Sequence, residues 1–203
     1  MGLTSIQWTD YTFNPWWGCT RVSPGCEHCY AETFAHRLGL DLWGPRAGRR
    51  FFDDRHWAEP LKWARRRAAG DRRHRVFCAS MADVFEDRRD LDVQRHYLWR
   101  LIGRTPELTW QLLTKRPQNA DKLTPGSWVL NGWPANVWAM TTAEDQQRAD
   151  ERIPALLRIP AKVRGVSLEP LLGPVDLERA GWLKRVWRSE AVGWEPCLNW
   201  VIV

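Results

Sequence analysis

Residues 75–80, RVFCAS, form a short run of nearly continuous apolar character. Four similar runs follow it, each too short for a helix: WQLLT at 110–114, VWAMTT at 137–142, VRGVSL at 163–168 and WVIV at 200–203. Strands show continuous rather than alternating apolarity when both faces of their sheet are covered, as in a parallel sheet. The runs therefore predict buried parallel strands.

Helical patterns lie between these runs. The segment DLDVQRHYLWRLIG, residues 90–103, begins with Asp90 as the expected cap. It places four apolar side chains near one helical stripe: Leu91, Leu98, Leu101 and Ile102.

A second helix is predicted for EDQQRADERIPALLR, residues 144–158. We expect Pro154 to kink or divide it, because proline lacks the amide hydrogen that a helix interior needs. Strands alternating with helices indicate βα units and therefore a barrel or an open α/β sheet. The 203 residues are expected to form a single domain, residues 1–203.

The sequence predicts a cytoplasmic protein. It has no run of 18 apolar residues, and its first residues, MGLTSIQWTDYTF, lack the features of a signal peptide. In a reducing compartment, clustered cysteines more often bind metal or do redox work than form disulfides. Cys78 and Cys197 lie in apolar contexts and are interpreted as small core residues. No membrane partner is expected.

The 30 Lys and Arg residues exceed the 24 Asp and Glu residues, which gives a net charge of +6. Much of the excess falls in KWARRRAAGDRRHR, residues 62–75. Such a basic run can bind nucleic acid phosphates, because neutralising them releases counterions. A solvated helix face is the competing interpretation.

Polar residues follow four of the predicted strands. In parallel α/β barrels the loops after the carboxyl ends of the strands carry the chemistry. Each of these residues could instead cap a helix, and the charged ones could form salt bridges at the rim of the sheet. The candidates for a shared site are Ser80, Asp83, Lys115, Arg116, Thr142, Glu144 and Glu169.

Cys19, Cys26 and Cys29 form a C-x6-C-x2-C array. Three thiolates suit a 4Fe-4S cluster in which three irons are held by protein and the fourth is left open. Gly18, Pro24 and Gly25 favour a tight loop around the sulfurs. The helix expected after Cys29 would present its positive amino end to the anionic cluster.

The stretch TSIQWTDYTFNPWWGCTRVSPGCEHCYAE, together with SMADVFED, LLTKRP and VSLEPLLGPVDL, closely resembles a phage-associated group of radical-SAM-like proteins of unknown function. This group is distantly similar to spore photoproduct lyase. The resemblance covers nearly the whole chain and implies a partial (β/α)6 TIM-like barrel of the radical SAM type. Here the barrel would end at the sixth strand.

The resemblance also implies the cofactors. A 4Fe-4S cluster would be carried by Cys19, Cys26 and Cys29, and S-adenosylmethionine would chelate the open iron. One-electron reduction by an electron donor would then release a deoxyadenosyl radical that abstracts hydrogen from a substrate. His28 stands where an aromatic residue of the family packs near the adenine. A nucleic acid or nucleotide is the expected substrate, from the basic run, the aromatic content and the distant similarity.

The cysteine spacing departs from the commonest radical-SAM pattern, C-x3-C-x2-C, by three extra residues in the first interval. Relatives continue past the sixth strand with a glycine-rich turn that carries a glutamate, whereas this sequence ends at WVIV. Two alternatives therefore stand beside the enzyme. One is a zinc-binding nucleic-acid module with His28 or His36 as fourth ligand. The other is a truncated, inactive remnant that binds a partner.

Overall fold

The computed structural model describes residues 3–66, 72–178, 181–183 and 197–203. Within the basic run, Arg67 and Asp71 lie outside the described residues. None of the helices among the described residues is long and apolar enough to cross a membrane.

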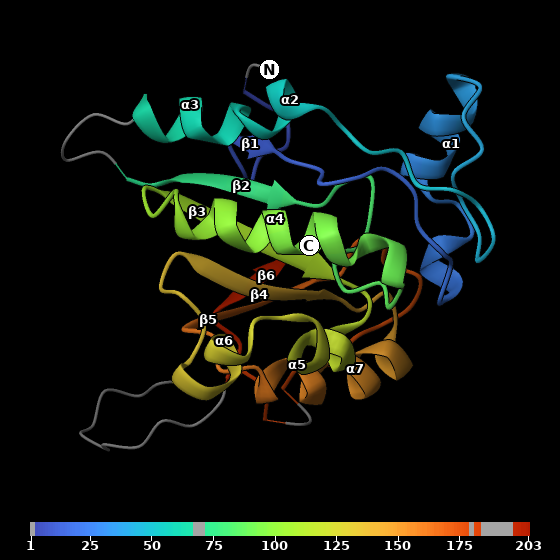
Figure 1. Cartoon of the computed structure of the whole chain (residues 1–203). Coiled ribbons are helices and arrows are strands. Elements are labelled where there is room, and N and C mark those ends of the chain that lie inside the picture. The colour runs from blue at the N-terminus through green and yellow to red at the C-terminus, as the bar shows by residue number, and fades with distance from the viewer. Residues whose placement is uncertain (1–2, 67–71, 179–180, 184–196) are drawn as a thin grey trace.

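A single six-stranded parallel sheet forms the centre of the structure (Figure 1). Its strands follow chain order, from β1 to β6, without interruption. Each of the five apolar runs overlaps one strand, so the predicted parallel α/β sheet is confirmed. The strands are β1 (Tyr11–Thr12), β2 (His74–Cys78), β3 (Leu108–Thr114), β4 (Val137–Thr142), β5 (Val163–Ser167) and β6 (Trp200–Ile202).

Helices connect the strands and cover one side of the sheet. Figure 1 shows α3 above β1 and β2, α4 in front of β3, and α5 and α7 below β4 and β5. The α-helices are α1 (Tyr30–Arg37), α2 (Asp54–Trp57), α3 (Glu59–Arg65), α4 (Asp92–Gly103), α5 (Ala120–Leu123), α6 (Gly126–Asn131) and α7 (Gln146–Arg158). Three short 3-10 helices, η1 (Pro24–Cys26), η2 (Arg89–Leu91) and η3 (Pro117–Asn119), lie in the connections.

The core lies between this helical layer and the outer face of the sheet. Val76, Trp110 and Leu112 of the sheet are fully buried in it. The expected apolar stripe of α4 is confirmed, because Leu91, Leu98, Leu101 and Ile102 are all buried.

The cap predicted for α4 is wrong. The helix begins at Asp92, and Asp90 lies in η2, where its carboxylate pairs with Arg88 at 2.6 Å. The sequence pattern did not reveal this, because the Asp90 carboxylate pairs with Arg88 and does not accept from the free backbone amides at the start of α4.

Pro154 does not divide the second predicted helix, since α7 runs continuously from Gln146 to Arg158. Proline removes one backbone hydrogen bond of the ladder. The buried side of the helix, which includes Ala149, Ile153 and Leu156, keeps it packed against β4 and β5. Asp145 caps its start by accepting from the Arg148 amide at 2.7 Å.

The sheet is curved, so that its inner face closes on itself. The Arg75 guanidinium of β2 lies 5.5 Å from the centre of the Trp200 ring of β6, although three strands separate β2 from β6. Side chains of distant strands meet in this way only when a sheet curls. The curvature and the strand order are consistent with a partial α/β barrel.

Candidate functional site

The three cysteines lie on the segment between β1 and α1, beyond the carboxyl end of β1. Cys26 ends η1, and Cys29 directly precedes Tyr30, the first residue of α1. All three are half-buried free thiols. In Figure 1 the strand arrows of β2 and β3 point toward the side of the molecule where α1 lies. We call residues 18–29 the cysteine loop.

Arg116 connects the first cysteine to the end of β3. Its guanidinium donates to the Sγ of Cys19 at 3.6 Å and also to the backbone oxygen of Thr20. Burial raises the pKa of the Cys19 thiol to about 12, although the positive charge of Arg116 opposes this shift. The thiol of the metal-free protein is therefore protonated at neutral pH, and a metal ion would displace its proton.

Asp83 holds Arg116 in place. Its carboxylate accepts from the Arg116 guanidinium at 2.8 Å, from the Thr114 hydroxyl at 2.7 Å and from the Lys115 amide at 3.0 Å. Asp83 and Arg116 are both buried. The loop after β2 and the end of β3 thus form one rigid support under Cys19.

A second buried ion pair joins the same part of the loop. Arg49 donates to both carboxylate oxygens of Glu86, at 2.7 and 3.2 Å. The Thr20 hydroxyl donates to Glu86 at 2.7 Å. Arg49 also binds the backbone oxygens of Leu42 and Ala47, at 3.0 and 2.9 Å. This pair fixes the residue that follows Cys19.

A third buried ion pair supports the other end of the loop. Glu144, just after β4, accepts from Arg152 of α7 at 2.7 Å and from the Gly25 amide at 3.3 Å. Gly25 leaves little room here, since a Cβ at this position would lie 2.9 Å from the Glu144 Cδ. Glu144 has a pKa below its ordinary value of 4.5: burial raises it, but a hydrogen bond from Ser23 and the charge of Arg152 lower it further.

Ser80, in the loop after β2, forms a fourth contact with the segment that carries the cysteines. Its hydroxyl accepts from the Asn14 amide at 3.0 Å, and its backbone oxygen accepts from the Tyr30 hydroxyl at 2.7 Å. Asn14 also accepts from the Met81 amide at 2.7 Å. The start of α1, next to Cys29, is thereby tied to the loop after β2.

The structure thus brings five of the predicted site residues beneath or beside the cysteine loop: Cys19, Ser80, Asp83, Arg116 and Glu144. Thr142 lies beside this group, because its backbone oxygen accepts from Arg152 at 2.8 Å. Lys115 is half-buried, while His28 and Glu169 are exposed and have no described contact with the group.

Three residues that the sequence did not single out are as important for holding the cysteine loop as the predicted ones. Arg49 and Glu86 form the second ion pair, Arg152 is the partner of Glu144 in the third, and nothing in their local pattern indicates these contacts. Arg49 and Glu86 are 37 positions apart. Only the VFED end of the SMADVFED motif could have pointed to Glu86.

The side chains offer the right donors for an iron–sulfur cluster, since three thiols are available on one loop and a cation lies beside one of them. Among the described residues, however, no three His, Cys, Asp or Glu side chains are gathered closely enough to hold a metal ion. Ligation by all three cysteines would therefore require their side chains to turn toward a common point.

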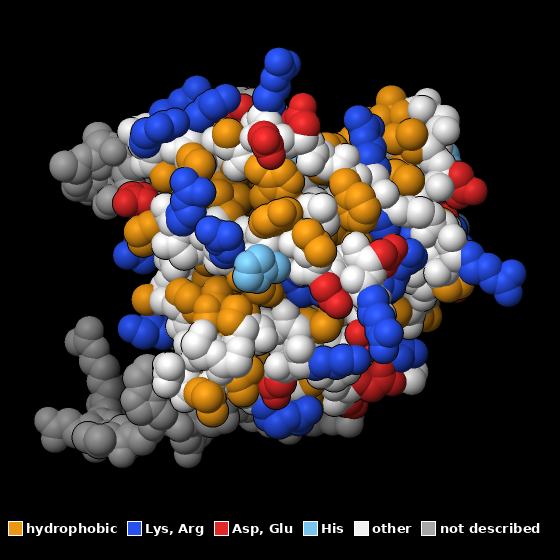
Figure 2. Space-filling model, viewed as in Figure 1, with side chains coloured by type: hydrophobic (Ala, Val, Ile, Leu, Met, Phe, Trp, Pro, Cys, Tyr) orange, Lys and Arg blue, Asp and Glu red, His pale blue; other side chains and the backbone are white. Residues whose placement is uncertain are grey.

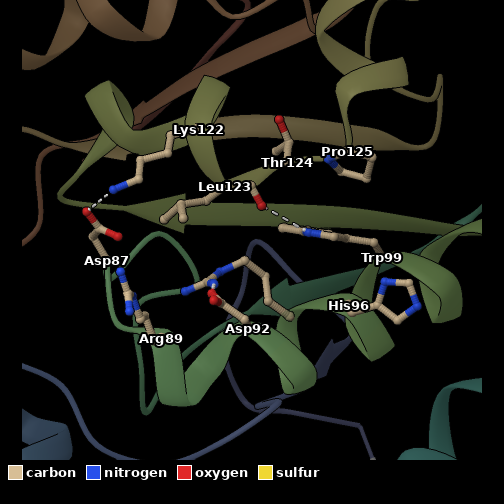
Figure 3. Close-up of a pocket in the computed structure, with 10 residues that line it drawn as sticks. Asp87, Arg89, Asp92, His96, Trp99, Lys122, Leu123, Thr124 and Pro125 are labelled. Atoms are coloured by element: carbon tan, nitrogen blue, oxygen red, sulfur yellow. Dashed lines mark hydrogen bonds and ion pairs between the residues drawn. The ribbon is translucent and has the colours of Figure 1, made fainter.

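A separate open groove of about 510 Å³ lies between α4 and α5 (Figure 3). None of the cysteines lines it. Its charged walls are paired with each other, Lys122 with Asp87 at 2.5 Å and Arg95 with Asp92 at 2.6 Å. Trp99 donates its indole hydrogen to the Leu123 oxygen at 3.1 Å. The groove belongs to the outer helical layer.

Comparison with known families gives one result, a match of residues 3–203 to the family described as "Protein of unknown function (DUF5131)". No curated protein and no solved structure matches the chain.

Proposed function

The chain belongs to the DUF5131 family of proteins of unknown function, and we propose that it is an iron–sulfur enzyme of the radical S-adenosylmethionine type. One observation carries the proposal: the cysteine loop lies over the carboxyl ends of β2–β4, where Arg116 contacts Cys19 and Glu144 contacts Gly25. This is the end of an α/β barrel at which catalytic groups collect.

Cys19, Cys26 and Cys29 would hold three irons of a 4Fe-4S cluster. With S-adenosylmethionine on the open iron and an electron donor, such a cluster supplies reductive cleavage of a carbon–sulfur bond and a deoxyadenosyl radical. Arg116 would donate a hydrogen bond to the Cys19 sulfur, and hydrogen bonds to ligand sulfurs help to set a cluster's potential.

Arg116 and Glu144 already bind the cysteine loop, and Asp83 holds Arg116 in place. We therefore assign all three a positioning role. The side chains of Lys115 and Thr142 lie at the same end of the sheet and are the better candidates for contacts with S-adenosylmethionine, whereas the Ser80 hydroxyl already bonds Asn14. His28 and Glu169 are exposed and would reach the cofactor only if the loops that carry them closed over it.

The proposed substrate is a nucleic acid or a nucleotide. Two features support this class, the basic residues at the end of α3 and the aromatic side chains of the inner face of the sheet. Figure 2 shows Lys and Arg side chains gathered over α3. Aromatic rings stack on unpaired bases.

The experiment is anaerobic reconstitution with iron and sulfide, followed by reduction and addition of S-adenosylmethionine. We expect a brown protein whose electron paramagnetic resonance signal shifts when S-adenosylmethionine is added, and 5′-deoxyadenosine after reduction with dithionite. A colourless protein that binds zinc would instead support the zinc-binding nucleic-acid module. Iron binding without either S-adenosylmethionine effect would reject the radical chemistry.

A further inference from the structure

The inner face of the curved sheet contains a buried amide without a partner. Gln111 of β3 has no exposed surface, and neither its Nε2 nor its Oε1 has a hydrogen-bond partner among the described residues. An unpaired buried polar group costs about 1–3 kcal/mol. A leucine of similar size would avoid this cost. We therefore expect the polar atoms of Gln111 to have a function.

Two other polar atoms on the same face share this condition. The Nε1 of Trp200 and the Nε of Arg75 are also buried and have no partner in the part of the chain that the structure describes, and the Arg75 guanidinium lies over the Trp200 ring. Together with Gln111, these side chains present several unused N–H donors and one unused acceptor, the Oε1 of Gln111.

Aromatic rings flank the amide. Phe77 of β2 and Trp138 of β4 are the register partners of Gln111, so all three side chains point to the inner face. Trp138 lies 5.3 Å from Trp200 between ring centres. The walls around Gln111 are therefore suited to a flat ring.

The same-face neighbour of Gln111 toward the carboxyl end of β3 is less buried than Thr109, its neighbour toward the amino end. Leu113, the next residue of β3 on the same face, is only half-buried, as is Trp138. Gln111 is three residues from the end of β3 at Thr114, which is about 10 Å at roughly 3.3 Å per residue. A ligand held at Gln111 would thus extend toward the cysteine loop.

We propose that the inner face binds a nucleobase by an edge on which a hydrogen-bond acceptor lies next to a donor. Gln111 would donate to the acceptor and accept from the donor, as side-chain amides do when they bind a base edge with two hydrogen bonds. The N–H groups of Trp200 and Arg75 would take further acceptor atoms of the ring. Each base carries such an edge, so the amide distinguishes a base from a ring without this pair of atoms.

This inference deepens the proposed function, because it names the residues that would hold the base of the substrate. Its test needs no iron. We would measure binding of uridine, guanosine, adenosine, cytidine and ribose to the full chain, without added iron, by calorimetry and ligand-observed NMR. Uridine should bind at least about tenfold more tightly than ribose, because ribose lacks the base edge that Gln111 would pair with.

The substitution Gln111→Leu should weaken uridine binding at least about tenfold and raise the melting temperature, which also shows that the variant folds. Trp200→Phe should weaken binding by a smaller factor. The matched control is Gln94→Leu, because Gln94 also has an unpaired buried Oε1 but lies on α4; binding should not change.

No binding of uridine, binding of ribose as tight as that of uridine, or full binding by the Gln111→Leu variant would overturn the proposal. So would Gln111-dependent binding of S-adenosylhomocysteine without uridine binding, because the face would then hold the adenine of a cofactor. An intact cluster in a protein that binds no nucleoside would reject this inference alone, and nucleoside binding without a cluster would reject the iron–sulfur assignment alone.

Discussion

The guanidinium of Arg116 lies 3.6 Å from the Sγ of Cys19, although the two residues are 97 positions apart in the chain. Arg116 follows β3, and Cys19 belongs to the segment after β1. The contact exists because parallel strands end at the same edge of the sheet. It places a permanent positive charge beside the first cysteine of the array.

Replacing Arg116 with Met should lower the free energy of unfolding by about 3–5 kcal/mol, because Asp83 would keep a buried charge without its cation. Urea denaturation measures this change. The double variant Arg116→Met, Asp83→Asn should lose less than the sum of the single variants, since it removes both charges. A single variant as stable as the natural protein would show that the pair does not support the loop.

Cys26→Ala should remove most of the iron from protein reconstituted anaerobically, because about four irons are expected on three thiolates. Iron and sulfide analysis with the visible spectrum provides the measurement. Cys197→Ala is the matched control, since Cys197 is also half-buried but precedes β6, and its iron content should stay unchanged. Equal iron content in both variants would remove the basis of the proposed function.

Glu144 should make stability dependent on acid pH. Its pKa in the folded state is below the ordinary value of 4.5, so its ion pair with Arg152 contributes stability above about pH 4.5. This contribution is lost as the pH falls further through the folded-state pKa. In Glu144→Gln, stability at pH 7 should fall by about 3–5 kcal/mol because Arg152 stays buried without its partner.

Thermal unfolding of both proteins between pH 3 and pH 7 tests this expectation. The difference in stability between the natural protein and Glu144→Gln should shrink toward low pH. A difference that stays constant over this range would show that the Glu144 charge is not the cause.

We expect the basic run to act as a peripheral docking surface for DNA. Arg65 and Arg66 are exposed at the end of α3, shortly before β2 begins at His74. They lie at the amino end of the strand, opposite the cysteine loop. Replacing Arg65, Arg66 and Arg67 with Ala should lower the slope of log affinity for DNA against log salt by about one for each lost phosphate contact.

Binding of single- and double-stranded DNA over a range of salt concentrations gives this slope. The double variant Arg158→Ala, Lys162→Ala removes exposed charges near the start of β5 and serves as the control. An unchanged slope in the triple variant would identify the basic run as a solvated helix face.

Local sequence was sufficient for the strands and the stripe of α4. The apolar run 110–114 predicted β3, and the spacing of Leu91, Leu98 and Ile102 predicted the buried side of α4, because both signals arise from burial of neighbouring residues. The β1 strand was not among these runs. At two residues it is too short to show a period.

Local rules failed where another contact outweighed them. Asp90 pairs with Arg88 instead of capping α4, and packing keeps α7 continuous through Pro154. Both are competitions between a local preference of about 1–3 kcal/mol and contacts that the sequence pattern does not reveal.

A parallel α/β sheet, the number and spacing of the thiols, and the polar residues at the strand ends could all be predicted from the sequence, because these features depend on residues close together in the chain. The tertiary structure decided which of them meet: Arg116 with Cys19, Arg49 with Glu86, and the unpaired Gln111 with Trp138 on the inner face. Such contacts depend on strand register and sheet curvature, which arise only when the whole sheet closes around its core.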